Sequence, residues 1–144
     1  MKAVIVFHSV CGNDYLVAKD FYEALKARGV DAGMFRVLDA SWVEKPDLSV
    51  KAKEVLHAMR ALPEATAQVL LDADLVIMGS PTYFGNVSAQ MKAFMDSTGG
   101  LWVKAAAAGK KFAAFTSAGN PEGGGDLCLQ ALHTYAKYMG MLSV

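Results

Sequence analysis

The sequence has few cysteines, no excess of either charge and no long apolar run. Its 144 residues include two cysteines, and 14 basic residues balance 14 acidic ones. Two cysteines cannot form the dense disulfide framework of a small secreted domain, and zero net charge does not attract nucleic acid or anionic membranes. No stretch approaches the roughly 20 apolar residues of a membrane span, and the apolar start at 3–7 is too short for a signal-peptide core. We therefore expect a cytoplasmic protein with no nucleic-acid or membrane partner.

Metal-binding residue types are also sparse. His8, His57 and His133 fall on unrelated segments, and the cysteines have no spacing typical of zinc. Most methionines lie at apolar positions, where they are typical core residues. We therefore expect no metal site.

Apolar content is sufficient for one hydrophobic core. Apolar residues make up 53% of the chain and charged residues 19%, which is typical of a globular protein and not of a disordered one. The length lies within the roughly 100 to 200 residues usual for one domain. We expect residues 1–144 to form a single domain.

Short apolar runs alternate with segments of helical periodicity. Runs typical of strands cover residues 3–7, 30–37, 75–79, 111–117 and, more briefly, 141–144. The runs at 3–7 and 75–79 have no polar alternation, which is typical of parallel strands covered on both faces. This order predicts an α/β fold with a parallel sheet and helices on both faces.

Residues 38–73 have the weakest pattern. Apolar residues share one helical face over 52–62, and Pro63 is of a type favoured in the first turn of a helix. We expect one helix over 52–62 and a short new helix beginning at Pro63. The charged residues within 30–37 indicate a strand near the sheet edge.

Three polar or glycine-bearing loops follow the strand-type runs at 3–7, 75–79 and 111–117. Open α/β sheets bind ligands at the carboxyl ends of their strands, where the strand order reverses. The coincidence of three such loops at that edge is the main functional signal in the sequence.

Each loop has a chemical and an ordinary interpretation. The first, 8–14, could surround a phosphate at a helix N-terminus, or could be a simple capping turn. The second, 79–86, presents Tyr83 and Phe84, which could stack on a flat ring or pack beneath the loop. The third, 116–126, has glycines that allow close approach to a ligand, or is a flexible connection.

These segments resemble a known group of proteins. Ser9-x-x-Gly12-Asn13 resembles the flavodoxin phosphate loop. The segment 79–86, G-S-P-T-Y-F-G-N, and the later segment 97–102, S-T-G-G-L-W, resemble the tryptophan-repressor-binding-protein type of NAD(P)H:quinone oxidoreductase, within the flavodoxin-like NADPH-dependent FMN reductases. The resemblance covers most of the chain and is weakest over 38–71.

The resemblance implies a flavodoxin-like three-layer sandwich with a five-stranded parallel sheet of order 2-1-3-4-5. The last strand is expected to be truncated, with no final helix after it. FMN would be bound without covalent attachment, and NAD(P)H would reduce a quinone or flavin substrate. A homodimer or homotetramer is also implied.

The same resemblance assigns the site residues by position. The phosphate would contact Ser9, Val10, Cys11, Gly12, Asn13 and Asp14; the isoalloxazine would contact Pro81, Thr82, Tyr83, Phe84, Gly85 and Asn86; the ring edge and ribityl chain would contact Ser117, Ala118, Gly119 and Asn120. Tyr138 lies near a position where the family often has histidine. The flavin itself performs the hydride chemistry, so no catalytic residue is expected. Asp14 stands where flavodoxins favour threonine, and a carboxylate near a phosphate predicts modest FMN affinity.

Two other functions are compatible with the same sequence. A flavodoxin-type carrier would pass single electrons between proteins, although such carriers generally use an acidic surface for steering and this chain is neutral. A flavin-free interaction domain is the other alternative, suggested by Asp14 and the missing final helix.

Overall fold

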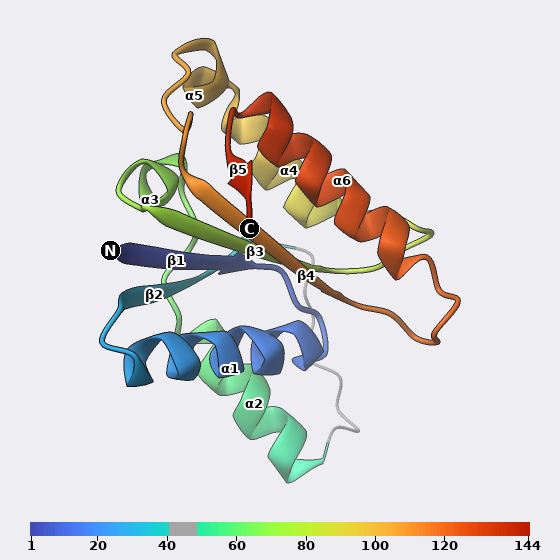
Figure 1. Cartoon of the computed structure of the whole chain (residues 1–144). Helices are drawn as coiled ribbons and strands as arrows, with labels where there is room; N and C mark the ends of the chain where they lie inside the picture. The colour runs from blue at the N-terminus through green and yellow to red at the C-terminus, as the bar shows by residue number, and fades with distance from the viewer. Residues whose placement is uncertain (41–48) are drawn as a thin grey trace.

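Strands and helices alternate along the chain (Figure 1). The computed structural model describes residues 1–40 and 49–144, so part of the weakly patterned segment lies outside the described residues. In chain order the elements are β1 (Lys2–Phe7), α1 (Asn13–Ala27), β2 (Asp31–Arg36), α2 (Val50–Arg60), α3 (Ala67–Leu71), β3 (Leu75–Pro81), α4 (Ala89–Ser97), α5 (Gly99–Val103), β4 (Lys111–Ser117), α6 (Gly125–Tyr138) and β5 (Leu142–Ser143).

The strands form one parallel sheet of order β2-β1-β3-β4-β5, which confirms the predicted topology. The partly polar strand β2 lies at an edge, as its charged residues indicated. Strand β3 is two residues longer than predicted, because Ser80 and Pro81 pair with Thr116 and Ser117 of β4. Strand β5 has two residues, and no helix follows it within the described part of the chain.

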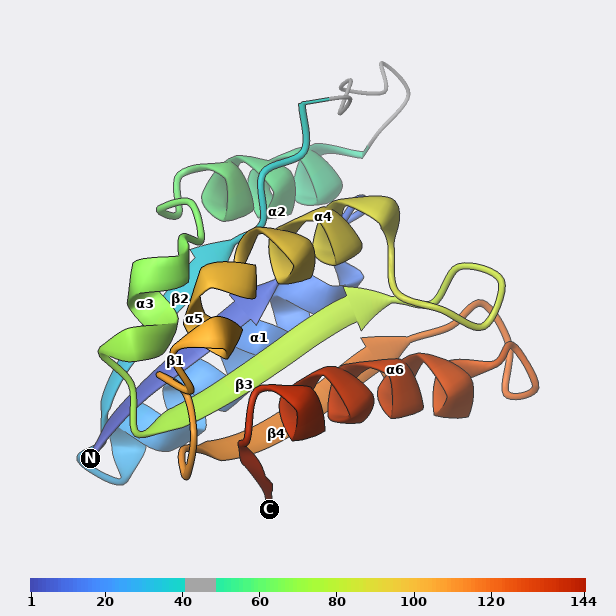
Figure 2. The ribbon, with the colours of Figure 1, turned by 90° about the horizontal axis from the view of Figure 1, so that it is seen from above.

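Helices cover both faces of the sheet. Figure 1 shows α1 and α2 on one side and α4 and α6 on the other, and Figure 2 shows the same layers from above. The side chains of β1 alternate between two hydrophobic clusters: Val4 and Val6 pack with α4 and α6, whereas Ile5 and Phe7 pack with α1 and α2. Because both faces are buried, every residue in 3–7 has to be apolar.

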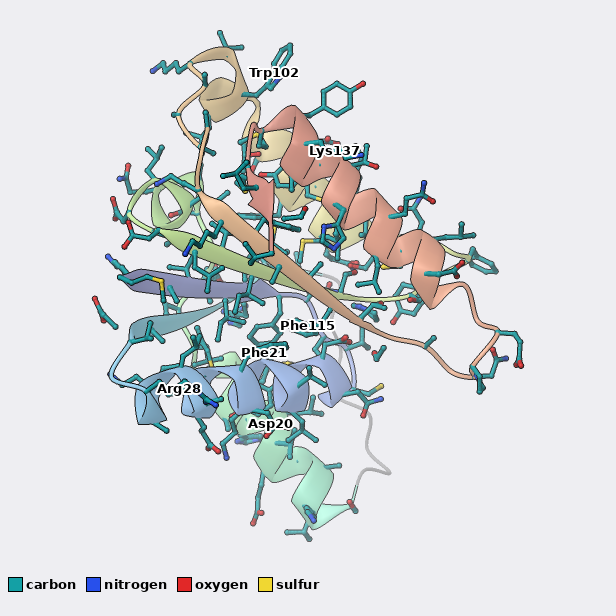
Figure 3. The ribbon with its side chains drawn as sticks, viewed as in Figure 1. Asp20, Phe21, Arg28, Trp102, Phe115 and Lys137 are labelled. Carbon is teal, nitrogen blue, oxygen red and sulfur yellow. The ribbon has the colours of Figure 1, made fainter. Side chains whose placement is uncertain are left out.

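Aromatic packing fixes α1 against the sheet. Phe21 on α1 points toward Phe115 on β4, with ring centroids 5.5 Å apart (Figure 3). Tyr15, closer to the N-terminus of α1, packs against Phe7 of β1, with ring centroids 6.0 Å apart. These contacts hold the N-terminus of α1 beside the carboxyl ends of β1 and β4.

The expected helix beginning at Pro63 is wrong. Helix α3 begins at Ala67, and residues 63–65 lie extended beside the end of β2. The Arg36 N–H donates to the Pro63 carbonyl at 3.0 Å, and the Ala65 N–H donates to the Arg36 carbonyl at 2.8 Å. Proline has no backbone N–H, but its carbonyl can still accept a hydrogen bond. It is therefore tolerated in a pairing at the sheet edge as well as in the first turn of a helix.

Within the described residues, no helix combines the length and apolarity needed to cross a bilayer.

Candidate functional site

The carboxyl ends of β1, β3 and β4 meet around a cavity of about 170 Å³. The cavity lies at the point where the strand order changes direction, between β1 and β3, the usual ligand position in such sheets. Its lining residues come from all three predicted loops: Ser9, Val10, Cys11, Asn13, Asp14, Pro81, Thr82, Tyr83, Ser117, Ala118 and Gly119. All of them belong to the set predicted from the sequence.

The first loop leads directly into α1. Gly12 is the N-cap, with φ 95°, and its N–H donates to the Ser9 hydroxyl at 3.1 Å. A β-carbon at Gly12 would lie 2.6 Å from the Val55 side chain of α2, so both conformation and space require glycine. The first N–H groups of α1 have no intrahelical partner, and such groups at a helix N-terminus favour an anion.

The second loop contains a tight turn over residues 83–86. The N–H groups of Tyr83 and Asn86 each donate to the carbonyl of the other, at 2.9 and 3.0 Å. Phe84 and Gly85 both have positive φ, 51° and 72°, as a type I′ turn requires. Tyr83 is 45% exposed and Phe84 fully exposed, so these rings do not pack beneath the loop.

Glycines join the second loop to the third. Gly124, the N-cap of α6, has φ 79°, and a β-carbon there would lie 2.9 Å from the α-carbon of Gly85. The Asn120 carbonyl accepts the Gly123 N–H at 3.1 Å. The third loop therefore begins at the cavity with Ser117 and reaches α6 by passing against the backbone of the second.

Asp14 is the charged residue of the cavity lining. It is 2% exposed, its Oδ2 accepts the Ser117 hydroxyl at 3.0 Å, and its buried Oδ1 has no hydrogen-bond partner. Burial raises the pKa of Asp14 to about 6, and hydrogen bonds from the Ser117 hydroxyl and from the backbone N–H groups of Asp14 and Ser117 oppose the shift. The pKa of Tyr83 is raised by burial and, to a smaller extent, by the negative charges of Cys11, Asp14 and Asp39.

The donor set of the cavity fits a phosphate in all respects but one. The Ser9 hydroxyl and the N-terminus of α1 suit an anion, whereas the Ser117 hydroxyl donates to Asp14 and no lysine, arginine or histidine lines the cavity among the described residues. Two unit charges about 4 Å apart repel by about 4 kcal/mol at an effective dielectric constant near 20. A helix N-terminus contributes only about 0.3–1 kcal/mol. An ionised Asp14 would therefore dominate the binding of a dianionic phosphate.

The cavity is smaller than a complete cofactor site, since small-molecule pockets usually have about 300–1,000 Å³. It is of a size for the phosphate and part of an attached chain. A flat ring would then extend toward the exposed rim formed by Tyr83 and Phe84.

Several predicted site residues do not line this cavity. The loop residues that do not line it are Gly12, Phe84, Gly85, Asn86 and Asn120. Tyr138 lies at the opposite end of α6. A helix of that length spans about 20 Å, so Tyr138 of the same chain cannot contact a ligand in this cavity.

A second and larger cavity, of about 530 Å³, lies between α4 and α6. Asn86 and Tyr138 line it, together with apolar residues such as Met95 and Leu127. We nevertheless place the site at the strand ends. Of the two cavities, the smaller one lies at the N-terminus of α1 and is lined by the buried polar side chains of Ser9 and Asp14.

One polar network beside the site was missed in the sequence. His8 is 1% exposed, and its Nε2 lies 3.3 Å from Oδ2 of Asp39. Gln90 of α4 donates to the other oxygen of Asp39 at 3.2 Å. Burial lowers the pKa of His8, and the hydrogen bond and charge of Asp39 oppose this shift. The usable signal was Asp39, a carboxylate following a strand-type run and therefore located at the same sheet edge.

Among the residues that the structure describes, no group of three or more His, Cys, Asp or Glu side chains is placed to hold a metal ion.

Comparison with known proteins identifies the family. The family model described as NADPH-dependent FMN reductase matches residues 1–144. The chain belongs to this family. This FMN reductase family member is 37% identical to the NAD(P)H dehydrogenase (quinone) of Deinococcus radiodurans, over 97% of the chain and 70% of the relative. It is 36% identical to the protein of the same name from Geobacter sulfurreducens, over 100% of the chain and 71% of the relative.

A solved structure has a similar fold. The family member superimposes on a WrbA-like flavodoxin from Agrobacterium tumefaciens with a TM-score of 0.71 and 28% identity, covering 98% of this chain and 74% of the other.

Proposed function

We propose that the chain binds FMN without covalent attachment and transfers electrons from NAD(P)H through the flavin to a quinone or a similar small acceptor. The observation that carries this proposal is the convergence of three separate loops on one cavity at the strand ends. The family and the names of the relatives, NAD(P)H dehydrogenase (quinone), support it.

Each loop has a distinct part in holding the cofactor. The first loop and the N-terminus of α1 bind the phosphate, with Ser9 and Asn13 at the cavity wall. Ser117, Ala118 and Gly119 follow the ribityl chain, and the segment 81–86 contacts the isoalloxazine. When bound, the flavin supplies the redox chemistry, and the protein supplies binding, orientation and electrostatics.

The exposed aromatic residues orient the ring and leave access to it. Tyr83 and Phe84 offer apolar faces to a planar partner, and aromatic pairs prefer offset or edge-to-face contact. Because both side chains stand at the surface, a nicotinamide and then a quinone can reach the same place in turn. No side chain of the site has to act as an acid or base on the substrate.

The test is turnover by the purified chain. Protein reconstituted with FMN should show a flavin absorption spectrum and should oxidise NADH or NADPH when benzoquinone is supplied. The matched control is Gly12→Val, whose side chain would collide with Val55 and distort the phosphate loop. Flavin-loaded protein that oxidises neither nicotinamide with any quinone would overturn the proposal.

Two alternatives predict different results in the same preparation. A single-electron carrier for protein partners would be reduced in two separate one-electron steps and would show little quinone turnover. A flavin-free interaction domain would bind no FMN at all. The neutral surface charge favours the enzyme over the carrier, because steering between carriers usually relies on net charge.

We further propose that residues 1–144 act as one cytoplasmic domain in a homodimer or homotetramer. Trp102 and Tyr138 are exposed aromatic residues that line one groove beside α5 and α6, and exposed apolar patches of this kind often mark protein interfaces. Only a second copy could bring Tyr138 to a flavin. Sedimentation equilibrium of the chain and of Trp102→Glu tests this, and a monomer at all concentrations would contradict it.

A further inference from the structure

Asp14 lines the cavity, and one of its two carboxyl oxygens has no hydrogen-bond partner. Its Oδ2 is held by the Ser117 hydroxyl, whereas Oδ1 is buried and has no hydrogen-bond partner. Buried polar atoms are nearly always hydrogen-bonded, and each exception indicates a missing partner or a functional group. Because Asp14 lines the cavity, a ligand bound there lies next to this carboxyl group.

Among the described residues, no positive side chain lines the cavity beside Asp14. The groups that line the cavity with it are Ser9 and Cys11 from the first loop, Tyr83 from the second loop and Ser117 from the end of β4. Of these, Cys11 and Tyr83 are titratable, and both become negative when they ionise. The Ser117 hydroxyl donates to one carboxyl oxygen, and no described side chain donates to the other.

We propose that FMN binds with one proton shared between Asp14 Oδ1 and an oxygen of its phosphate, so that cofactor binding takes up a proton and Asp14 sets the affinity for the phosphate. This inference rests on the proposed function, because it requires flavin in the cavity. The proton comes from solvent or from whichever acid carries it before binding, and no other bond forms or breaks.

Two titrations favour the shared proton. Burial holds the pKa of Asp14 at about 6 in the free protein. The second pKa of a phosphate monoester is also about 6. Above pH 7 the Asp14 carboxyl group and the phosphate are therefore both ionised before binding, so the complex has to take up one proton when it forms. Linkage then predicts that the Kd for FMN rises by about tenfold for each pH unit above neutrality.

Riboflavin is the matched probe, because it has the same ring and chain and lacks the phosphate. Quenching of flavin fluorescence gives the Kd of FMN and of riboflavin between pH 7.0 and 8.5. We expect the Kd of FMN to rise by about thirty-fold over this range and that of riboflavin to stay constant. Calorimetry at pH 7.5 in two buffers of different ionisation enthalpy should give uptake of close to one proton per FMN.

Variants separate Asp14 from the rest of the site. In Asp14→Asn the amide donates a hydrogen bond at every pH, so FMN should bind more tightly than to the unaltered chain at pH 8.5, with a flat pH profile. Ser117→Ala removes a bond that lowers the pKa of Asp14, so its loss of FMN affinity should begin at a higher pH. The calorimetric proton count uses the unaltered chain and remains informative if a variant fails to fold.

The outcomes distinguish this inference from the proposed function. Equal pH slopes for FMN and riboflavin, the same FMN slope in Asp14→Asn, or no proton uptake would overturn the shared proton while leaving flavin binding intact. Failure of the unaltered chain to bind either flavin at any pH would overturn both proposals.

Discussion

The ring of Phe115 lies across the α-carbon of Gly79 on the neighbouring strand. A β-carbon on Gly79 would approach the ring atoms to between 2.0 and 2.5 Å. The ring cannot move away freely, because it is buried and packs against Phe21. We expect Gly79→Ala to lower the free energy of unfolding by about 1–3 kcal/mol, as overpacking of a core does. Urea unfolding measures the change.

Gly100→Ala is the control, since no atom lies within 4 Å of a β-carbon there and Gly100 is helical. It should leave stability unchanged or raise it by up to about 1 kcal/mol. The cost of Gly79→Ala should shrink in a Phe115→Leu background, and an undiminished cost would show that the ring is not its cause.

Phe84 occupies a turn position that suits asparagine better than phenylalanine. Its φ of 51° is a left-handed conformation, which costs a non-glycine residue about 1–2 kcal/mol. Phe84→Asn should therefore raise stability by about 1 kcal/mol, and should weaken flavin binding about fivefold by removing a stacking ring. Thermal unfolding of the flavin-free chain and fluorescence titration measure the two effects.

Phe84→Leu separates the two roles, because it removes the ring and keeps an apolar side chain in the same strained position. It should weaken flavin binding without raising stability. Unchanged affinity in both variants would argue against a role of Phe84 at the ring.

Ser88 caps α4 from a fully buried position. Its hydroxyl accepts the Met91 N–H at 3.2 Å, and its own N–H donates to the hydroxyl of Ser80 at 2.9 Å. Ser88→Ala should cost about 2 kcal/mol, the upper end for loss of an N-cap, because no water replaces the buried bond. Ser49→Ala, which removes the exposed cap of α2, should cost less than about 1 kcal/mol. Equal costs would show that burial of the cap has no effect.

The raised pKa of Asp14 makes the flavin-free chain less stable at neutral pH than at pH 4. The pKa in the folded chain, about 6, exceeds the ordinary aspartate value of 3.8, so the stabilising contribution is complete below pH 3.8 and is lost as the pH rises through about 6. The difference of 2.2 pKa units corresponds to about 3 kcal/mol. Asp14→Asn should therefore gain stability relative to the unaltered chain by up to this amount between pH 4 and 7.5. A stability difference between the two proteins that does not change with pH would show that the pKa of Asp14 is not raised.

His8 should have the opposite pH dependence. Burial lowers its pKa below 6.5, so its contribution to stability is present above pH 6.5 and lost as the pH falls through the folded pKa. His8→Gln should remove this acid-side loss, whereas His57→Gln on the exposed face of α2 should leave it in place. Urea unfolding at pH 5 and 7.5 compares the three proteins.

The parallel sheet and the location of the cavity could be predicted from local patterns, whereas the strand order followed from the resemblance to flavodoxin-like proteins. The apolar runs that became β1 and β3 are buried on both faces, and a loop after a parallel strand always reaches the same sheet edge. The edge position of β2 followed from its charged residues for the same reason.

The errors and omissions arise where distant segments meet. Pro63 suits a helical first turn and an edge pairing equally, and only the nearby Arg36 decides between them. The burial of Asp14 depends on Ser117, which is 103 residues away in the sequence. The network of His8, Asp39 and Gln90 likewise joins three segments of the chain that share no motif.

Gly85 and Gly124 touch backbone to backbone, with no side chain between the turn after β3 and the start of α6. This contact fixes the second loop against the third. Inserting residues into either loop would displace the other, so substitutions that change which molecules bind are best tolerated in the first loop, around Val10 and Cys11.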